Sequence, residues 1–187
     1  LTLGDFPPGW SELPSVDNPD NDDSNRRLAE CVGLDRDSIL DSPASAETGD
    51  FNDPEENVEV NQTVGLEATE QDAIDLMTGF AGPDVLTCVS EVYNDTVVDA
   101  LDVSDDVEIG EITVARLNVS PAGDDVQASR VVIPFTTQGL EIDVIADLVL
   151  VRVGRSLSGL FFGSQFAPIP IETLDEYTGL ATSRLPG

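Results

Sequence analysis

The residues that could do chemistry in this sequence are carboxylates, arginines and two cysteines, because the chain contains neither His nor Lys. Without imidazole, a thiol-imidazole nucleophile cannot form, and a zinc site lacks its usual nitrogen ligands. Cys31 and Cys88 both fall on apolar stripes with helical spacing, and we expect both to face inward. The residues leave two alternatives, a disulfide or two free buried thiols in a cytosolic protein. The even cysteine count favours the disulfide.

Paired carboxylates can act as acid and base only where one of them is removed from water. The acidic runs "NPDNDDS" and "DVSDDVE" lie in polar loops, where solvated charge is the better interpretation. Asp143 and Asp147 alternate with Ile145 on the less apolar face of a predicted strand. They are more interesting as catalytic candidates, and they also fit a plain exposed face. The sequence therefore predicts no catalytic residue, no metal site and no cofactor.

Four residues are candidates for contact with a ligand: Trp10, Arg152, Arg155 and Phe161. The two arginines flank a predicted turn at Gly154 and could hold an anion, although neutralisation of neighbouring carboxylates is the better interpretation. An exposed Phe161 on a sheet could line a groove, and core packing is the alternative. Trp10 lies in an N-terminal segment that must be pinned to the body of the protein.

The charge balance excludes whole classes of partner. The chain has 187 residues, with 37 acidic against 8 basic side chains and a formal net charge of -29. Such a surface repels nucleic acids and anionic lipid headgroups, and it favours a soluble monomer. No apolar run reaches the 18 residues that a membrane-spanning helix needs. Because no charged start or apolar run precedes Leu1, we expect a mature form whose export signal has been removed.

Hydrophobic periodicity predicts an α+β fold. Alternation predicts strands over residues 57–68, 107–119, 126–139, 140–153 and 154–166, the last four joined closely enough to form an antiparallel meander. Helical spacing predicts a short helix around Cys31, a helix over residues 69–80 capped by Thr69 and Asp72, a helix around Cys88, and a terminal helix over residues 169–185. The economical packing is a two-layer sandwich of about five antiparallel strands with helices on one face.

The whole chain, residues 1–187, is expected to form a single domain, whose size suits one hydrophobic core. Residues 1–24 are rich in Pro and Gly and are predicted to be an extended segment, and residues 25–187 to form the α+β body. A second polar, Pro-containing stretch over residues 41–57 is predicted to be a linker.

Five stretches, "LTLGDFPPGWSE", "LAECVGLD", "DVLTCVSEVY", "GEITVARLNV" and "LVLVRVGRSLSGLFF", together resemble a group of actinobacterial secreted proteins and lipoproteins of unknown function. That group is similar to extracellular sensor-like domains of mycobacterial receptor kinases and to lipoproteins with a PsbP-like fold. The resemblance implies export to the extracellular space or cell surface, a Cys31 to Cys88 bridge, and a lipid anchor upstream of Leu1. It supplies no catalytic residue.

The leading hypothesis is a non-enzymatic binding or sensor-type domain of the cell envelope, with an envelope ligand or protein as its partner. The ligand is expected between the sheet and the helices or beside Trp10. One alternative is a carboxylate-dependent hydrolase of envelope polymers, which requires two facing acids across a cleft. Another is a structural envelope protein that uses a protein-protein interface.

Overall fold

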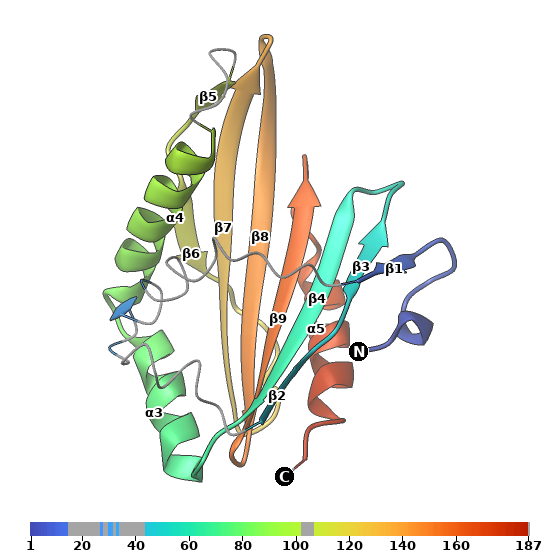
Figure 1. Ribbon diagram of the computed structural model, residues 1–187, viewed down its shortest axis with the longest axis vertical. Helices are drawn as coiled ribbons and strands as arrows, with labels where there is room; N and C mark the ends of the chain where they lie inside the picture. The colour runs from blue at the N-terminus through green and yellow to red at the C-terminus, as the bar shows by residue number, and fades with distance from the viewer. Residues whose placement is uncertain (15–26, 28–29, 32, 34–43, 102–106, 187) are drawn as a thin grey trace.

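A nine-stranded antiparallel sheet organises the computed structural model, which describes residues 1–14, 27, 30–31, 33, 44–101 and 107–186 (Figure 1). The main path of the sheet runs β1-β3-β4-β9-β8-β7-β5, while β2 pairs with β4 and β6 pairs with β7. The strands are β1 (Ser11–Leu13), β2 (Ala44–Glu47), β3 (Asp50–Asp53), β4 (Val58–Leu66), β5 (Val107–Ile109), β6 (Thr113–Arg116), β7 (Asp125–Thr137), β8 (Leu140–Val153) and β9 (Ser156–Gln165). The predicted α+β class is thereby confirmed.

The predicted meander is present in β7, β8 and β9, which are joined by tight turns and pair along nearly their full length. Gln138 and Gly139 connect β7 to β8 with positive φ values of 52° and 78°, as a type I′ turn requires. Gly154, at φ 57°, makes the next turn. These are the positions at which the sequence predicts hairpins.

The strand predicted over residues 107–119 is divided into β5 and β6, because β7 contains Pro134. Proline has no N–H to offer a neighbouring strand, so the ladder is interrupted at this point. β5 pairs with β7 up to Ile109 opposite Phe135, and β6 resumes at Thr113 opposite Val132. Gly110 donates its backbone N–H to the Pro134 carbonyl at 2.8 Å and bridges the interruption.

Two consecutive helices cover one face of the sheet. α3 (Glu70–Ala81) begins with the predicted capping box, in which Thr69 accepts from the Asp72 backbone and Asp72 accepts from the Thr69 backbone. Its buried residues Ala73, Leu76 and Met77 pack with Leu157 of β9. α4 (Val85–Leu101) follows directly and presents Val85, Val89 and Tyr93 to the sheet. A short 3-10 helix, η1 (Leu3–Asp5), lies near the start of the chain.

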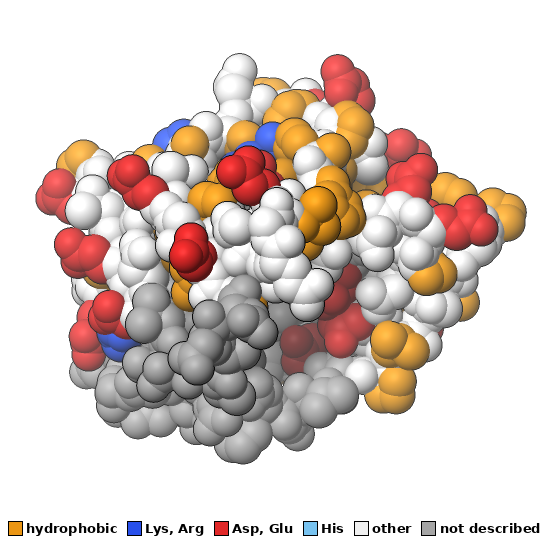
Figure 2. Space-filling view, turned by 90° about the horizontal axis from the view of Figure 1, so that it is seen from above, with side chains coloured by type: hydrophobic (Ala, Val, Ile, Leu, Met, Phe, Trp, Pro, Cys, Tyr) orange, Lys and Arg blue, Asp and Glu red, His pale blue; other side chains and the backbone are white. Residues whose placement is uncertain are grey.

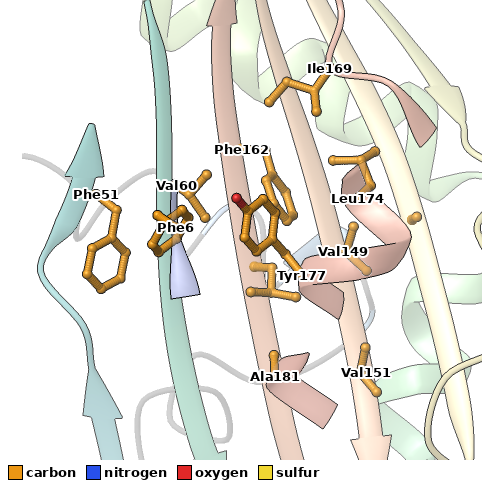
Figure 3. Packing of buried hydrophobic residues seen from close by; sticks show 12 residues of the cluster. Phe6, Phe51, Val60, Val149, Val151, Phe162, Ile169, Leu174, Tyr177 and Ala181 are labelled. Carbon is orange, nitrogen blue, oxygen red and sulfur yellow. The ribbon is translucent and has the colours of Figure 1, made fainter. Parts of the chain in front are cut away.

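The terminal helix α5 (Ile171–Thr182) lies on the opposite face, so the prediction of helices on one face only is wrong (Figure 1). Figure 3 shows α5 directing Leu174, Tyr177 and Ala181 toward the sheet. The opposing side chains are Phe51, Val60, Val149, Val151, Leu160 and Phe162. Successive residues of β8 and β9 point to opposite faces, and here both faces bury apolar side chains.

The prediction of about five strands is also wrong, because segments assigned to linkers add β1, β2 and β3. β3 is held by Phe51, which is 1% exposed in the core beneath α5. β2 exposes every side chain and is held through its backbone pairing with β4. β1 belongs to the N-terminal segment and pairs with β3, so residues 1–14 are only partly extended loop. Residues 15–24, and most of the helix predicted around Cys31, lie outside the described residues.

Candidate functional site

Cys31 and Cys88 form a disulfide, the pairing that the sequence favours and the family resemblance implies. Their Cα atoms are 5.5 Å apart, and 57 residues separate them along the chain. Both cysteines are half-buried. Cys31 packs against Val85 and Val89 on the inner side of α4. The bridge therefore attaches the N-terminal part of the chain to the helix that covers the sheet.

A cavity of about 360 Å³ separates the sheet from the end of α3 and the first half of α4. This volume lies within the roughly 300–1,000 Å³ typical of small-molecule sites. The helices contribute an apolar wall made of Phe80, Val85, Leu86, Val89 and Tyr93. The sheet contributes the opposite wall, made of Asn61, Thr63, Arg116, Gln127, Ala128, Ser129, Leu148, Val149, Leu150, Gly159, Leu160 and Phe161.

Gly159 explains why the space is open. It lies in the middle of β9, between Leu150 of β8 and Thr63 of β4, where a larger residue would fill the layer under α4. A Cβ atom built on Gly159 meets no atom within 4 Å. The ring of Phe161 turns the other way, with its Cε1 3.1 Å from a Cβ built on Gly163. The cavity is therefore a gap in the side-chain layer, left by one glycine and an aromatic ring that does not cover it.

Phe161 is the one of the four candidate ligand residues that lines this cavity. Trp10 lies in the other core, where it stacks on Phe6 with ring centroids 4.5 Å apart, and Phe6 in turn contacts Tyr177 of α5. Sequence reasoning singled out Phe161 and missed Gly159. A signal was available, since alternation places Gly159, Phe161 and Gly163 on one face of β9, and a packed layer seldom carries two glycines so close together.

The two candidate arginines are engaged within the protein. Arg152 lies 3.5 Å from carboxylate oxygens of both Glu70 and Asp124, and it donates to the Gly154 carbonyl at 2.9 Å. Arg155 donates to the backbone carbonyls of Glu67 and Ala68. Neither arginine lines the cavity. Arg152 thus neutralises carboxylates, as the sequence interpretation allowed.

Asp147 is fully buried, so the alternative that places it on a plain exposed face is wrong. It points toward the α5 side of β8, where Arg130 of β7 donates Nε to Oδ1 at 2.6 Å and Nη2 to Oδ2 at 2.7 Å. Arg130 also donates to the Ile169 carbonyl just before α5, at 3.0 Å. Both carboxylate oxygens are used by this pair, which is the geometry of a structural ion pair.

A second carboxylate environment lies beside the cavity, on β3 and β4. Burial, followed by the negative charge of Asp50, raises the pKa of Glu59 above its ordinary value. Asp50 also accepts a hydrogen bond from Asn61 at 3.3 Å, and Asn61 lines the cavity. Asp50 and Glu59 extend from neighbouring strands rather than from opposite walls of a cleft. The acidic loop over residues 18–24 lies outside the described residues.

The charge of the cavity differs from that of the molecule as a whole. Figure 2 shows acidic side chains distributed over the end of the protein, with few basic ones among them. In contrast, the described residues that line the cavity include Arg116 and no carboxylate. Burial raises the pKa of the lining residue Tyr93, which keeps its hydroxyl neutral. The site can accommodate an apolar group, with hydrogen-bonding side chains at its margins.

Comparison with known proteins adds a distant structural similarity. No family model and no curated protein sequence matches the chain. Among solved structures, it is similar to LpqN, described as involved in cell envelope biogenesis of Mycobacterium tuberculosis, with 10% identity and a TM-score of 0.33. The alignment covers 94% of this chain and 75% of the LpqN chain.

None of the helices in the described part of the chain has the length and apolar character needed to span a membrane.

Proposed function

We propose that this protein is a non-enzymatic binding or sensor-type domain of the cell envelope, and that the apolar part of its ligand occupies the cavity above Gly159. The observation that carries the proposal is the open position over this glycine, where an added Cβ meets nothing within 4 Å. Protein interiors are ordinarily packed without gaps of this size. A site kept open between apolar walls favours a ligand over a purely structural role.

The disulfide supports the location outside the cytoplasm. Bridges such as Cys31–Cys88 form and persist mainly in oxidising compartments, including the surface of cells and the extracellular space. A lipid anchor upstream of Leu1 remains part of the proposal on the family resemblance alone. The non-enzymatic role draws support from Asp147, whose oxygens are both held by Arg130, and from Asp50 and Glu59, which extend from neighbouring strands rather than across a cleft.

The proposal is tested by filling the cavity. Gly159→Leu places an apolar side chain in the open space, and we expect it to abolish binding of an uncharged apolar dye such as Nile red. Binding is measured from the fluorescence increase and blue shift of the dye on titration with folded protein. The wild-type protein is expected to bind the dye at one saturable site, the apolar cavity above Gly159.

Gly179→Leu is the matched control. Gly179 is an exposed position on α5, on the far side of the sheet, and a Cβ built there also meets nothing within 4 Å. The same change in composition is therefore made away from the cavity. Dye binding that survives Gly159→Leu, or that is lost equally in Gly179→Leu, would show that the dye is held elsewhere and would remove the proposal.

A further inference from the structure

The charged side chain at the margin of the cavity identifies the class of ligand more closely, an inference that rests on the proposed function. Arg116 ends β6 and lines the cavity from one side. Of the arginines that the structure describes, Arg27, Arg130, Arg152 and Arg184 each pair with a carboxylate. Arg155 donates to backbone carbonyls, as Arg116 does, but it does not line the cavity. Arg116 instead donates to neutral oxygens, and its positive charge is therefore not cancelled by a neighbouring carboxylate within the described residues.

Hydrogen bonds to the end of α3 and to Gln127 position the guanidinium of Arg116. One terminal nitrogen donates to the carbonyls of Phe80 and Gly82 at the end of α3, the latter at 3.2 Å, and the other lies 3.4 Å from the side-chain oxygen of Gln127. The last turn of α3 contains no basic residue of its own, so Arg116 supplies the positive charge that helix carbonyls favour. These bonds hold the guanidinium beside Phe80, which forms part of the apolar wall.

The register of the sheet connects this cation to the cavity floor. Arg116 pairs with Ser129 of β7, which pairs with Leu148 of β8, which pairs with Phe161 of β9. These residues form one row on the face beneath α4, next to Gly159. Three inter-strand spacings of about 4.8 Å separate β6 from β9, or about 14 Å in all. The row is polar at its β6 end, with Arg116 and Ser129, and apolar at its β9 end, with Leu148 and Phe161.

We propose that the cavity binds a single-chain amphiphile with an anionic head, whose carboxylate contacts Arg116 and whose hydrocarbon chain lies over Leu148 toward Gly159. Arginine provides planar, charge-assisted hydrogen bonds to such a head. The net charge of -29 opposes anions at long range, but at physiological ionic strength charges farther away than about 8 Å are largely screened. A cation in direct contact with the head is screened much less.

The test compares two probes with one hydrocarbon chain. Dodecanoate carries an anionic head and dodecanol a neutral one, and calorimetric titrations of each are made at neutral pH and about 0.15 M salt. We expect the wild-type protein to prefer dodecanoate by about tenfold or more, as a charge-assisted hydrogen bond provides. Arg116→Gln should remove this preference, so that the two probes bind with equal affinity, and Arg116→Lys should keep most of it.

Retained dodecanol binding in Arg116→Gln shows that the cavity is still formed, which separates loss of the cation from loss of the α3 contacts. Equal affinity of the wild-type protein for the two probes would overturn the anionic head while leaving the apolar site in place. An unchanged preference in Arg116→Gln would overturn the role of Arg116. Failure of both probes to bind the folded wild-type protein would overturn the proposed function itself.

Discussion

Replacing Arg130 by Met should destabilise the protein strongly, because it leaves the Asp147 carboxylate buried without a partner. The Asp147 side chain is 0% exposed and that of Arg130 is 19% exposed, so the pair is shielded from water mainly on the acidic side. Removing one member of a buried pair costs about 3–5 kcal/mol, since the remaining charge keeps its desolvation penalty. Met retains most of the apolar stem of Arg130, which restricts the effect to the charge and its hydrogen bonds.

Removing the charge of Asp147 instead of that of Arg130 should lower the free energy of unfolding by less. Asp147→Asn leaves an arginine that still reaches water and keeps its 3.0 Å bond to the Ile169 carbonyl, so we expect a loss of about 1–3 kcal/mol. The double variant Arg130→Met, Asp147→Leu removes both charges, and such replacements are often neutral or stabilising. The double variant should therefore be more stable than Arg130→Met alone.

Urea unfolding followed by far-ultraviolet circular dichroism measures these differences, provided that the slope with denaturant is unchanged among the variants. The double-mutant cycle, closed with the single variant Asp147→Leu, then gives a coupling free energy of about 3 kcal/mol or more between the two positions. A cost below about 1 kcal/mol for Arg130→Met, or additive effects of the two single changes, would mean that water reaches Asp147. The account of the α5 face as a dry core would then be wrong.

Two further predictions concern contacts between distant parts of the chain. Reduction of the Cys31–Cys88 bridge should lower the free energy of unfolding by about 4 kcal/mol, because it frees a loop of 57 residues in the unfolded state; equal urea midpoints with and without reductant would contradict this. Two 2.6 Å hydrogen bonds from Arg184 hold the pKa of Asp5 well below its usual range. The stability they provide is present above the ordinary Asp pKa of about 3.9 and is lost as the pH falls through the lowered value, so the advantage of the wild type over Asp5→Asn should disappear in strong acid, and an advantage that persists there would contradict the reasoning.

Sequence patterns sufficed for the elements whose identity is local. The alternation of β8, the glycine turns on either side of it and the Thr69 capping box of α3 each depend on neighbouring residues, and each is present. The edge strands were missed for a physical reason. β2 and β1 expose all their side chains, so their sequences carry no apolar alternation. Their hydrogen bonds come from a partner strand that local reasoning does not supply.

The side on which α5 packs depends on a comparison between the two faces of β8. Its even-numbered residues give the stronger apolar pattern, and Asp143 and Asp147 made the odd-numbered face look solvated. The charge of Asp147 is neutralised by Arg130, which is 17 residues earlier in the chain but directly opposite in the sheet register. Once that pair is counted as one buried unit, Ile145, Val149 and Val151 form a second apolar face. A covering helix on that side then follows.

The candidate site was harder to predict because it is a gap in the side-chain layer and not a set of residues with a recognisable pattern. Apolar residues on α4 and on the sheet are the same types that would make a closed core, and no single side chain marks the difference. The space above Gly159 is open because the ring of Phe161 turns toward Gly163. Both glycines lie two residues from Phe161 on the same face of β9, so the ring can fill the space above only one of them. With the ring turned toward Gly159 instead, it would cover the floor of the cavity. The rotamer of Phe161 is thus the local feature on which the openness of the cavity depends, and it connects the residue that sequence reasoning identified to the glycine that it missed.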